Sequence, residues 1–290
     1  MTRVLLATSR GWADGEPGAA HLDAALAARG IDSRWAVWDD PEVDWAAADL
    51  VAVRSTWDYI ERPEQFLEWA RGVEASTRLL NGADVFAWNL DKAYLAGLDG
   101  IPAVPTVPAD TVADLSAAVA RFGTAVVKPR IGAGGAGVLV VDDPADPRLG
   151  QEIDDHPELH NGRGPWVVQP LVESVRTSGE TSVFVIGGQT VSQVDKLPTA
   201  DEIRVHEHFG GSSRPVPLTD EAAALAYDAF AAASGLLGVT LTYGRADMMR
   251  LADGTLAISE LELVEPGLYL DVLPDNADPF ADVVVAVTRG

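Results

Sequence analysis

The feature that most restricts the fold of this 290-residue chain is a glycine-rich stretch at residues 126–138, VVKPRIGAGGAGV. Residues 132–137 match the dinucleotide pattern G-x-G-x-x-G, which signals a Rossmann domain only when a helix follows the glycines. Here VLVV follows at 138–141, four residues that favour a strand. A P-loop is excluded too, because its lysine follows the glycines, whereas Lys128 precedes them. The stretch therefore predicts a strand–loop–strand hairpin with a lysine on its first strand.

Composition narrows the class of protein and of partner. The net charge of −23 argues against a nucleic-acid partner. No run approaches the roughly 18 apolar residues of a membrane span, and the apolar start is too short for a signal peptide. We expect a cytoplasmic protein with no membrane partner. With no cysteine, disulfides and thiolate catalysis are excluded.

Only three of the 21 basic residues are lysines: Lys92, Lys128 and Lys196. The chain thus uses arginine wherever any positive charge suffices. Positions that keep lysine are candidates for a compact ammonium group rather than a planar guanidinium.

Hydrophobic periodicity predicts three units along the chain. Strands alternating with helices up to about residue 100 indicate a parallel α/β domain. A proline-rich connector at 101–108 leads to a helix at 112–122 and the glycine hairpin. The last unit has strands at 181–186, 190–194, 240–250 and 255–264, a polar loop at 197–217 and a helix at 220–233. The predicted domains are 1–100, 101–172 and 173–290.

Three carboxylates are expected to converge near the C-terminus. Alternation along the strand at 255–264 puts Glu260 and Glu262 on one face. A turn at 253–254 folds Asp247 back towards them. Such carboxylates repel one another unless cations lie between them, and Mg²⁺ prefers oxygen ligands that it shares with substrate phosphates. The alternative is that they are solvent-facing carboxylates opposite arginines.

The glycine hairpin, the isolated lysines and the late Asp…Glu-x-Glu hairpin together resemble an ATP-grasp ligase, the group that includes glutathione synthetase and the D-alanine–D-alanine ligases. The stretches RSTWDY at 54–59 and WNLDK at 88–92 are similar to actinobacterial members related to the ligase that closes the cycloserine ring. The resemblance implies an α/β fold in which an N-terminal open parallel α/β domain precedes two α+β lobes that clamp ATP.

The resemblance also implies a nucleotide site. Lys92 and Lys128 would contact the phosphates, and backbone N–H groups of the glycine loop would cover the β/γ end, where a Cβ would hold the backbone away. Residues 169–172 would form the hinge that binds adenine, and Glu180 would hold a ribose hydroxyl. The implied set is Lys92, Lys128, Gly134, Gly135, Gly137, Gln169, Leu171, Val172 and Glu180.

Asp247, Glu260 and Glu262 would bind two Mg²⁺ ions, with Mn²⁺ as an alternative. Relatives commonly have Asn where Glu262 stands, so this chain carries an extra negative charge there. Arg245 lies one alternation step from Asp247 and would orient a substrate carboxylate.

Arg204 matches the family arginine that steadies the transferring phosphoryl group, and Lys196 would help to neutralise it. The alternative for Arg204 is a surface arginine paired with Asp201 or Glu202.

Arg54, Trp57 and Asp58 follow a predicted strand end, where ligands of open α/β sheets gather. They are the expected substrate site.

These inferences predict an ATP-dependent carboxylate–amine ligase, or an intramolecular amide-forming one, that acts on a small amino-acid-like substrate through an acyl phosphate. The expected partners are a small-molecule acid and an amine, and a homodimer or homotetramer is compatible with such folds. Two alternatives stay open: a small-molecule kinase of the same fold, and a nucleotide-binding protein without turnover.

Overall fold

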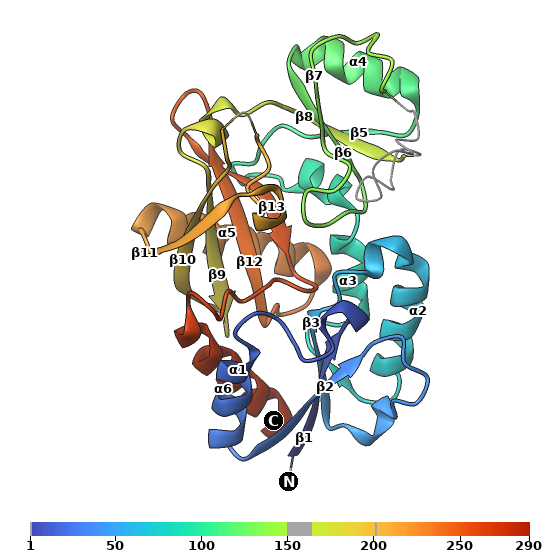
Figure 1. Cartoon of the computed structure of the whole chain (residues 1–290), viewed down its shortest axis with the longest axis vertical. Coiled ribbons are helices and arrows are strands. Elements are labelled where there is room, and N and C mark those ends of the chain that lie inside the picture. Colours follow the sequence, from blue (N-terminus) through green and yellow to red (C-terminus); the bar gives the residue numbers. More distant parts are fainter. Residues whose placement is uncertain (1, 150–163, 201) are drawn as a thin grey trace.

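Three β-sheets organise the chain, as a computed structural model that describes residues 2–149, 164–200 and 202–290 shows (Figure 1). The N-terminal sheet lies at one end of the molecule and the sheet with the glycine hairpin at the other. The largest sheet lies between them in the view of Figure 1.

The N-terminal sheet is open and entirely parallel, as predicted. Its strands have the order β2-β1-β3-β4. They are β1 (Thr2–Thr8), β2 (Ile31–Val37), β3 (Leu50–Ser55) and β4 (Arg78–Leu79). The central strands are continuous apolar runs because helices cover both faces of the sheet. Helix α1 (Ala19–Ala28) packs on one face, and α2 (Pro63–Glu74) with α3 (Ala83–Asn89) on the other.

The second sheet carries the glycine hairpin and has its own core. Its antiparallel strands are β5 (Val107–Ala109), β8 (Trp166–Pro170), β6 (Ala125–Pro129) and β7 (Leu139–Val141), in that spatial order. The predicted strand–loop–strand hairpin is confirmed, because β6 and β7 pair antiparallel. Helix α4 (Val112–Phe122) begins at a capping box in which Thr111 and Asp114 satisfy each other's backbone N–H groups.

The third sheet is antiparallel, with the order β11-β10-β9-β12-β13. Its strands are β9 (Glu180–Ile186), β10 (Gln189–Leu197), β11 (Ser212–Val216), β12 (Tyr243–Arg250) and β13 (Leu256–Glu262), and α5 (Asp220–Leu237) packs against it. Strand β11 lies inside the segment predicted to be a polar loop. It is an edge strand of sequence SSRPV, without the alternation that signals a strand, and it forms by pairing with β10.

Helix α6 (Ala277–Arg289) is the last element of the chain, and the sequence patterns did not predict it. It packs beside α1, and Figure 1 shows the two helices next to each other at the lower left. Phe280 and Val284 of α6 share a core with Leu6 of β1 and Phe184 of β9. The N-terminal sheet and the third sheet are therefore packed together, and the division at residues 100 and 172 stays a prediction. Over the described residues, no helix is both long and apolar enough to span a membrane.

Candidate active site

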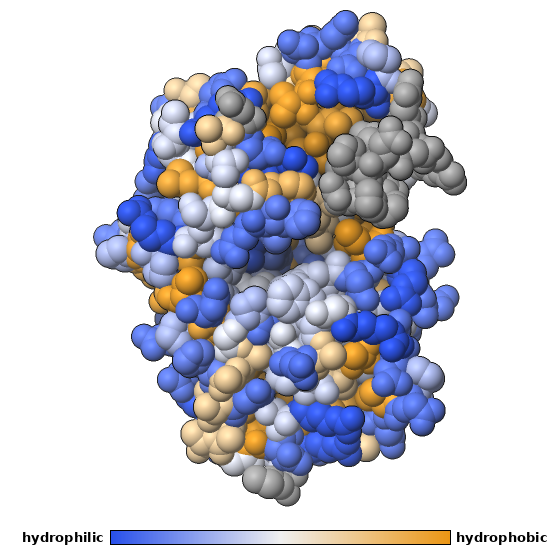
Figure 2. All heavy atoms as spheres, in the orientation of Figure 1, coloured by the Kyte–Doolittle hydropathy of each residue, from blue (hydrophilic) through white to orange (hydrophobic). Residues whose placement is uncertain are grey.

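All three sheets contribute to one cavity of about 560 Å³. Figure 2 shows the surface hollowed near the middle of the visible face. The glycine loop and Lys128 of β6 line one side of the cavity, while Asp247 of β12 and Glu260 of β13 line the other. Trp57, which follows β3, brings in the N-terminal sheet.

The glycine loop turns through backbone conformations that favour glycine: φ is 61° at Gly134, 78° at Gly135 and 71° at Gly137. A Cβ on Gly135 would come within 3.3 Å of both Arg204 and Phe209. The loop therefore lies directly against the segment that contains Arg204. Gly134 and Gly135 line the cavity, as do Ala136 and Val138, whereas Gly137, which was predicted to do so, is not among the lining residues.

Lys128 is half-buried and forms no hydrogen bond or ion pair with any residue that the structure describes. Burial lowers the pKa of its ammonium group, although Glu260 and Glu180 counteract part of this effect. An ammonium group in this state is stabilised by an anion that enters the cavity.

The other two lysines have partners. Lys92 Nζ lies 2.9 Å from Glu260 Oε1 and also donates to the carbonyl of Gly132, so it links the glycine loop to β13. Lys196 Nζ lies 3.1 Å from Glu180 and 3.2 Å from Asp247. Both lysines line the cavity.

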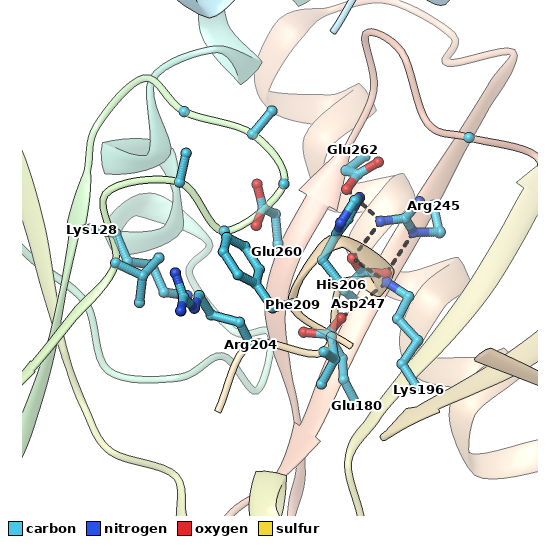
Figure 3. A pocket seen from close by; sticks show the side chains of 18 of the residues that line it. Lys128, Glu180, Lys196, Arg204, His206, Phe209, Arg245, Asp247, Glu260 and Glu262 are labelled. Atoms are coloured by element: carbon cyan, nitrogen blue, oxygen red, sulfur yellow. Dashed lines mark hydrogen bonds and ion pairs between the residues drawn. The ribbon is translucent and has the colours of Figure 1, made fainter. Parts of the chain in front are cut away.

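The acidic hairpin has the expected register. Asp247 lies opposite Glu260 and Arg245 opposite Glu262, so all four side chains share one face, as Figure 3 shows for the labelled residues. Arg245 Nε lies 2.7 Å from Asp247 Oδ1, and its guanidinium also contacts Glu262. Burial favours the neutral acid, but Arg245 and Lys196 hold the pKa of Asp247 well below its usual range.

Basic side chains thus lie among the three carboxylates, which corrects the argument that metal ions alone could relieve their repulsion. Within the described parts of the chain, no three His, Cys, Asp or Glu side chains are grouped as a metal site. The donor chemistry still fits Mg²⁺, because Asp247, Glu260 and Glu262 present carboxylate oxygens to the cavity. The ion would take the place of Lys92 at Glu260 and of Arg245 at Glu262.

The predicted adenine hinge and ribose contact also line the cavity. Gln169 is the penultimate residue of β8, and Leu171 and Val172 follow the end of that strand at the cavity wall. Glu180 is buried and accepts hydrogen bonds from Lys196 and Ser259.

Arg204 combines a position at the cavity with an acidic partner, and its action on the transferring phosphoryl group stays a prediction. It lines the cavity, and its guanidinium stacks 3.5 Å from the centre of the Phe209 ring (Figure 3). It also pairs with Glu202 at 2.6 Å. Asp201, the other expected partner, lies outside the described residues.

The three predicted substrate residues differ in their position relative to the cavity. Trp57 lines the cavity, but Arg54 and Asp58 do not. Arg54 is completely buried and pairs with Glu16 at 2.6 Å, and Asp58 accepts a hydrogen bond from Trp38 Nε1 at 2.8 Å. Arg54 is thus held inside the N-terminal domain, Asp58 remains partly exposed outside the cavity lining, and a substrate contact by either side chain stays a prediction.

Arg54 and Trp57 instead hold the loop at residues 265–268. Trp57 Nε1 donates to the carbonyl of Glu265 at 3.1 Å, and Arg54 to that of Pro266 at 2.7 Å. The carboxylate of Glu16 accepts from Leu268 N–H at 2.7 Å. The N-terminal sheet thereby fixes one wall of the cavity.

Sequence reasoning missed several cavity residues, among them Trp12, Glu16, Tyr59, Glu265 and Tyr269. Glu16 could have been found because it follows the carboxyl end of a parallel strand, the edge where ligands of such sheets bind. Glu265 carried a weaker signal, its position just beyond the acidic strand.

A glycine hairpin and an acidic hairpin that face each other across one cavity, behind a parallel α/β domain, define the ATP-grasp class of ligase. Comparison with known proteins agrees. Residues 94–240 match the family model of the prokaryotic glutathione synthetase ATP-grasp domain. The chain belongs to the ATP-grasp ligase family, whose members generally use ATP and Mg²⁺.

Residues 4–81 match a second model, the N-terminal domain of D-cycloserine synthetase DcsG. The cycloserine biosynthesis protein DcsG of Streptomyces lavendulae is 32% identical over 268 residues, which is 88% of each chain. A crystal structure of D-cycloserine synthetase DcsG superposes with a TM-score of 0.86 at 29% identity and covers 99% of both chains. The D-alanyl-alanine synthetase A of Vibrio cholerae, at 14% identity and a TM-score of 0.65 over 99% of this chain and 97% of that one, shares the fold.

Proposed function

We propose that this protein is an ATP-dependent ligase that joins a carboxylate to an amine, within one small amino-acid-like molecule or between two, through an acyl phosphate. One observation carries the proposal. A half-buried Lys128, which has no anionic partner among the described residues, lies beside the glycine loop, and the Asp247–Glu260 pair faces them across the cavity. The likeness to DcsG over most of the chain supports it.

The basic side chains would hold the triphosphate. Lys128 is available without breaking an ion pair, and Lys92 would exchange Glu260 for phosphate oxygens. Gly134 and Gly135 line the cavity, and without a Cβ to block the approach their backbone N–H groups would donate to phosphate oxygens. The contact of Gly135 with Arg204 and Phe209 would keep water from the reacting phosphate.

Asp247, Glu260 and Glu262 would hold Mg²⁺. We expect two ions, and Mn²⁺ could replace them. The metal supplies charge neutralisation at the triphosphate. Arg204, Arg245 and Lys196 would then stabilise the charge that develops on the transferring group and orient the substrate carboxylate.

In the reaction, an oxygen of the substrate carboxylate attacks the γ-phosphorus, and ADP leaves with the electrons of the broken P–O bond. The nitrogen nucleophile then attacks the acyl carbon, and phosphate leaves as the C–N bond forms. We place the reaction in the cytoplasm, with small molecules as its only substrates.

A trapping experiment tests the proposal. D- and L-amino acids are supplied singly and in pairs with ATP and Mg²⁺, and ADP release is followed with mass detection of coupled products. Added hydroxylamine should be converted to a hydroxamate by reaction with the acyl phosphate. A stable phosphorylated product without hydroxamate would identify a kinase instead, and background ADP release across the panel would indicate a binding protein without turnover.

A further inference from the structure

Glu265 stands apart from the acidic residues considered so far. It lines the cavity although only 7% of its surface is exposed, and it follows the metal-facing strand by three residues. Its loop is held by Trp57 at its own carbonyl, by Arg54 at the next carbonyl and by Glu16 at Leu268 N–H. The position of the carboxyl group is therefore set by contacts from the N-terminal sheet.

Unlike Asp247, Glu260 and Glu262, Glu265 forms no ion pair with any residue that the structure describes. Its side chain accepts a hydrogen bond from the Tyr59 hydroxyl. Burial is the main reason that the pKa of the Glu265 carboxyl is raised to about 7. The hydrogen bond from Tyr59 and the charge of Lys92 act to lower it, and Glu260 acts to raise it.

The remaining charged and titratable neighbours are few. On β12, the charge of Glu265 helps to raise the pKa of the Tyr243 hydroxyl. The ion pair of Arg54 with Glu16 lies next to the loop, where Arg54 donates to the carbonyl of Pro266. None of these groups neutralises Glu265 directly. A carboxyl group in this setting can gain and lose a proton near neutral pH, as a general base must.

The surroundings of Glu265 suit an ammonium group. Trp12 and Trp57, whose rings meet edge-to-face at 5.1 Å, line the cavity together with Tyr59 and Tyr269. Aromatic faces attract cations, and the attraction grows when water is excluded. The Tyr269 ring already faces two cations, with Lys196 Nζ 5.8 Å and the Arg245 guanidinium carbon 5.6 Å from its centre. Trp57 and Tyr59, which contact Glu265 directly, are therefore the aromatic residues that an ammonium group at Glu265 would meet.

We propose that Glu265 receives the ammonium group of the amine substrate and removes its proton before the C–N bond forms. This inference rests on the proposed function. The proton passes from nitrogen to a carboxylate oxygen of Glu265, and the freed lone pair attacks the acyl carbon. The C–O bond to phosphate breaks, and phosphate leaves with its electron pair. Tyr59, Trp57 and Arg54 act as positioning residues.

Replacing Glu265 with glutamine separates the two half-reactions. Acyl phosphate formation does not use Glu265, and hydroxylamine is uncharged at the assay pH, so it needs no base. Glu265→Gln should lower amine coupling by at least about 10²-fold. It should leave hydroxamate formation by the same acid within about threefold of wild type.

The pH profile provides a second readout. Amine coupling by the wild type should fall below about pH 7 as Glu265 becomes protonated, and that acidic limb should be missing from the residual activity of Glu265→Gln. Glu265→Asp should restore part of the coupling. The matched control is Glu42→Gln, an exposed glutamate outside the cavity lining, which should behave as wild type.

The outcomes separate this inference from the proposed function. Equal losses of coupling and hydroxamate formation in Glu265→Gln would overturn the role of Glu265 as a base. If the wild type formed no hydroxamate with any acid, the proposed function itself would fail. A ¹³C NMR titration of the Glu265 carboxyl needs no substrate, and a midpoint near the ordinary value of about 4.3 would overturn the inference on its own.

Discussion

Replacing Arg54 with methionine tests how the N-terminal sheet supports the cavity wall. The side chains of Arg54 and Glu16 are 0% and 1% exposed, and Arg54 Nε and Nη2 lie 2.9 and 2.6 Å from Glu16 Oε1. Methionine can occupy much of the same apolar space, since the guanidinium carbon lies 4.9 Å from the Phe280 ring centre. Among the residues that the structure describes, the change leaves the buried Glu16 carboxylate with the Leu268 N–H as its one partner, and it removes the donor to the Pro266 carbonyl.

Loss of one partner from a buried ion pair costs about 3–5 kcal/mol. At roughly 2 °C per kcal/mol for a chain of this size, the melting temperature should fall by about 6–10 °C. Scanning calorimetry at pH 7 measures the change. Arg62→Met is the matched control, because Arg62 also pairs with a carboxylate, Asp39 at 2.8 Å, but is 37% exposed. That change should cost no more than about 1 kcal/mol.

Adding Glu16→Gln to Arg54→Met should recover part of the lost stability, because the unpaired buried charge is gone. The reasoning is refuted if Arg54→Met destabilises the protein no more than Arg62→Met does. It is also refuted if the double variant is less stable than the sum of the two single changes predicts.

Three further predictions concern the cavity. Lys128→Met and Glu260→Gln should each lower ADP release by at least about 10²-fold with an unchanged circular dichroism spectrum, and near-normal rates in either would contradict the site. Gly135→Ala and Gly100→Ala, both at φ 78°, should each cost about 1 kcal/mol of stability. Gly135→Ala should also lower turnover about tenfold, whereas Gly100→Ala should not, because a Cβ at Gly100 meets open space. Equal turnover of the two variants would count against the contact of the glycine loop with Arg204 and Phe209. Because the folded pKa of Glu265 lies at about 7, above its unfolded value, the folded state binds more protons between about pH 4.5 and 7. The free energy of unfolding of wild type relative to Glu265→Gln should therefore fall by about 2.5 kcal/mol from pH 5 to 8 in chemical denaturation, whereas a constant difference would show that Glu265 titrates normally.

Local sequence patterns predicted the parts of the site that depend on neighbouring residues. The strand after the glycines specified a hairpin, because a run of β-favouring residues follows the loop. The turn at 253–254 and the alternation of β13 placed Asp247 opposite Glu260, because side-chain direction in a paired strand has a period of two. The resemblance of these motifs to a known family then led to ATP and to Lys128.

Tertiary packing decided the rest. Arg54 looked like a substrate residue because it ends a parallel strand, yet it lies buried against Glu16, and its contact with Pro266 joins residues 212 positions apart. Glu265 owes its setting to the same long-range contacts. Helix α6 follows the acidic hairpin and reaches back to α1, and β11 exists by pairing with β10. Such features depend on which surfaces exclude water from each other, and periodicity within one segment does not contain that information.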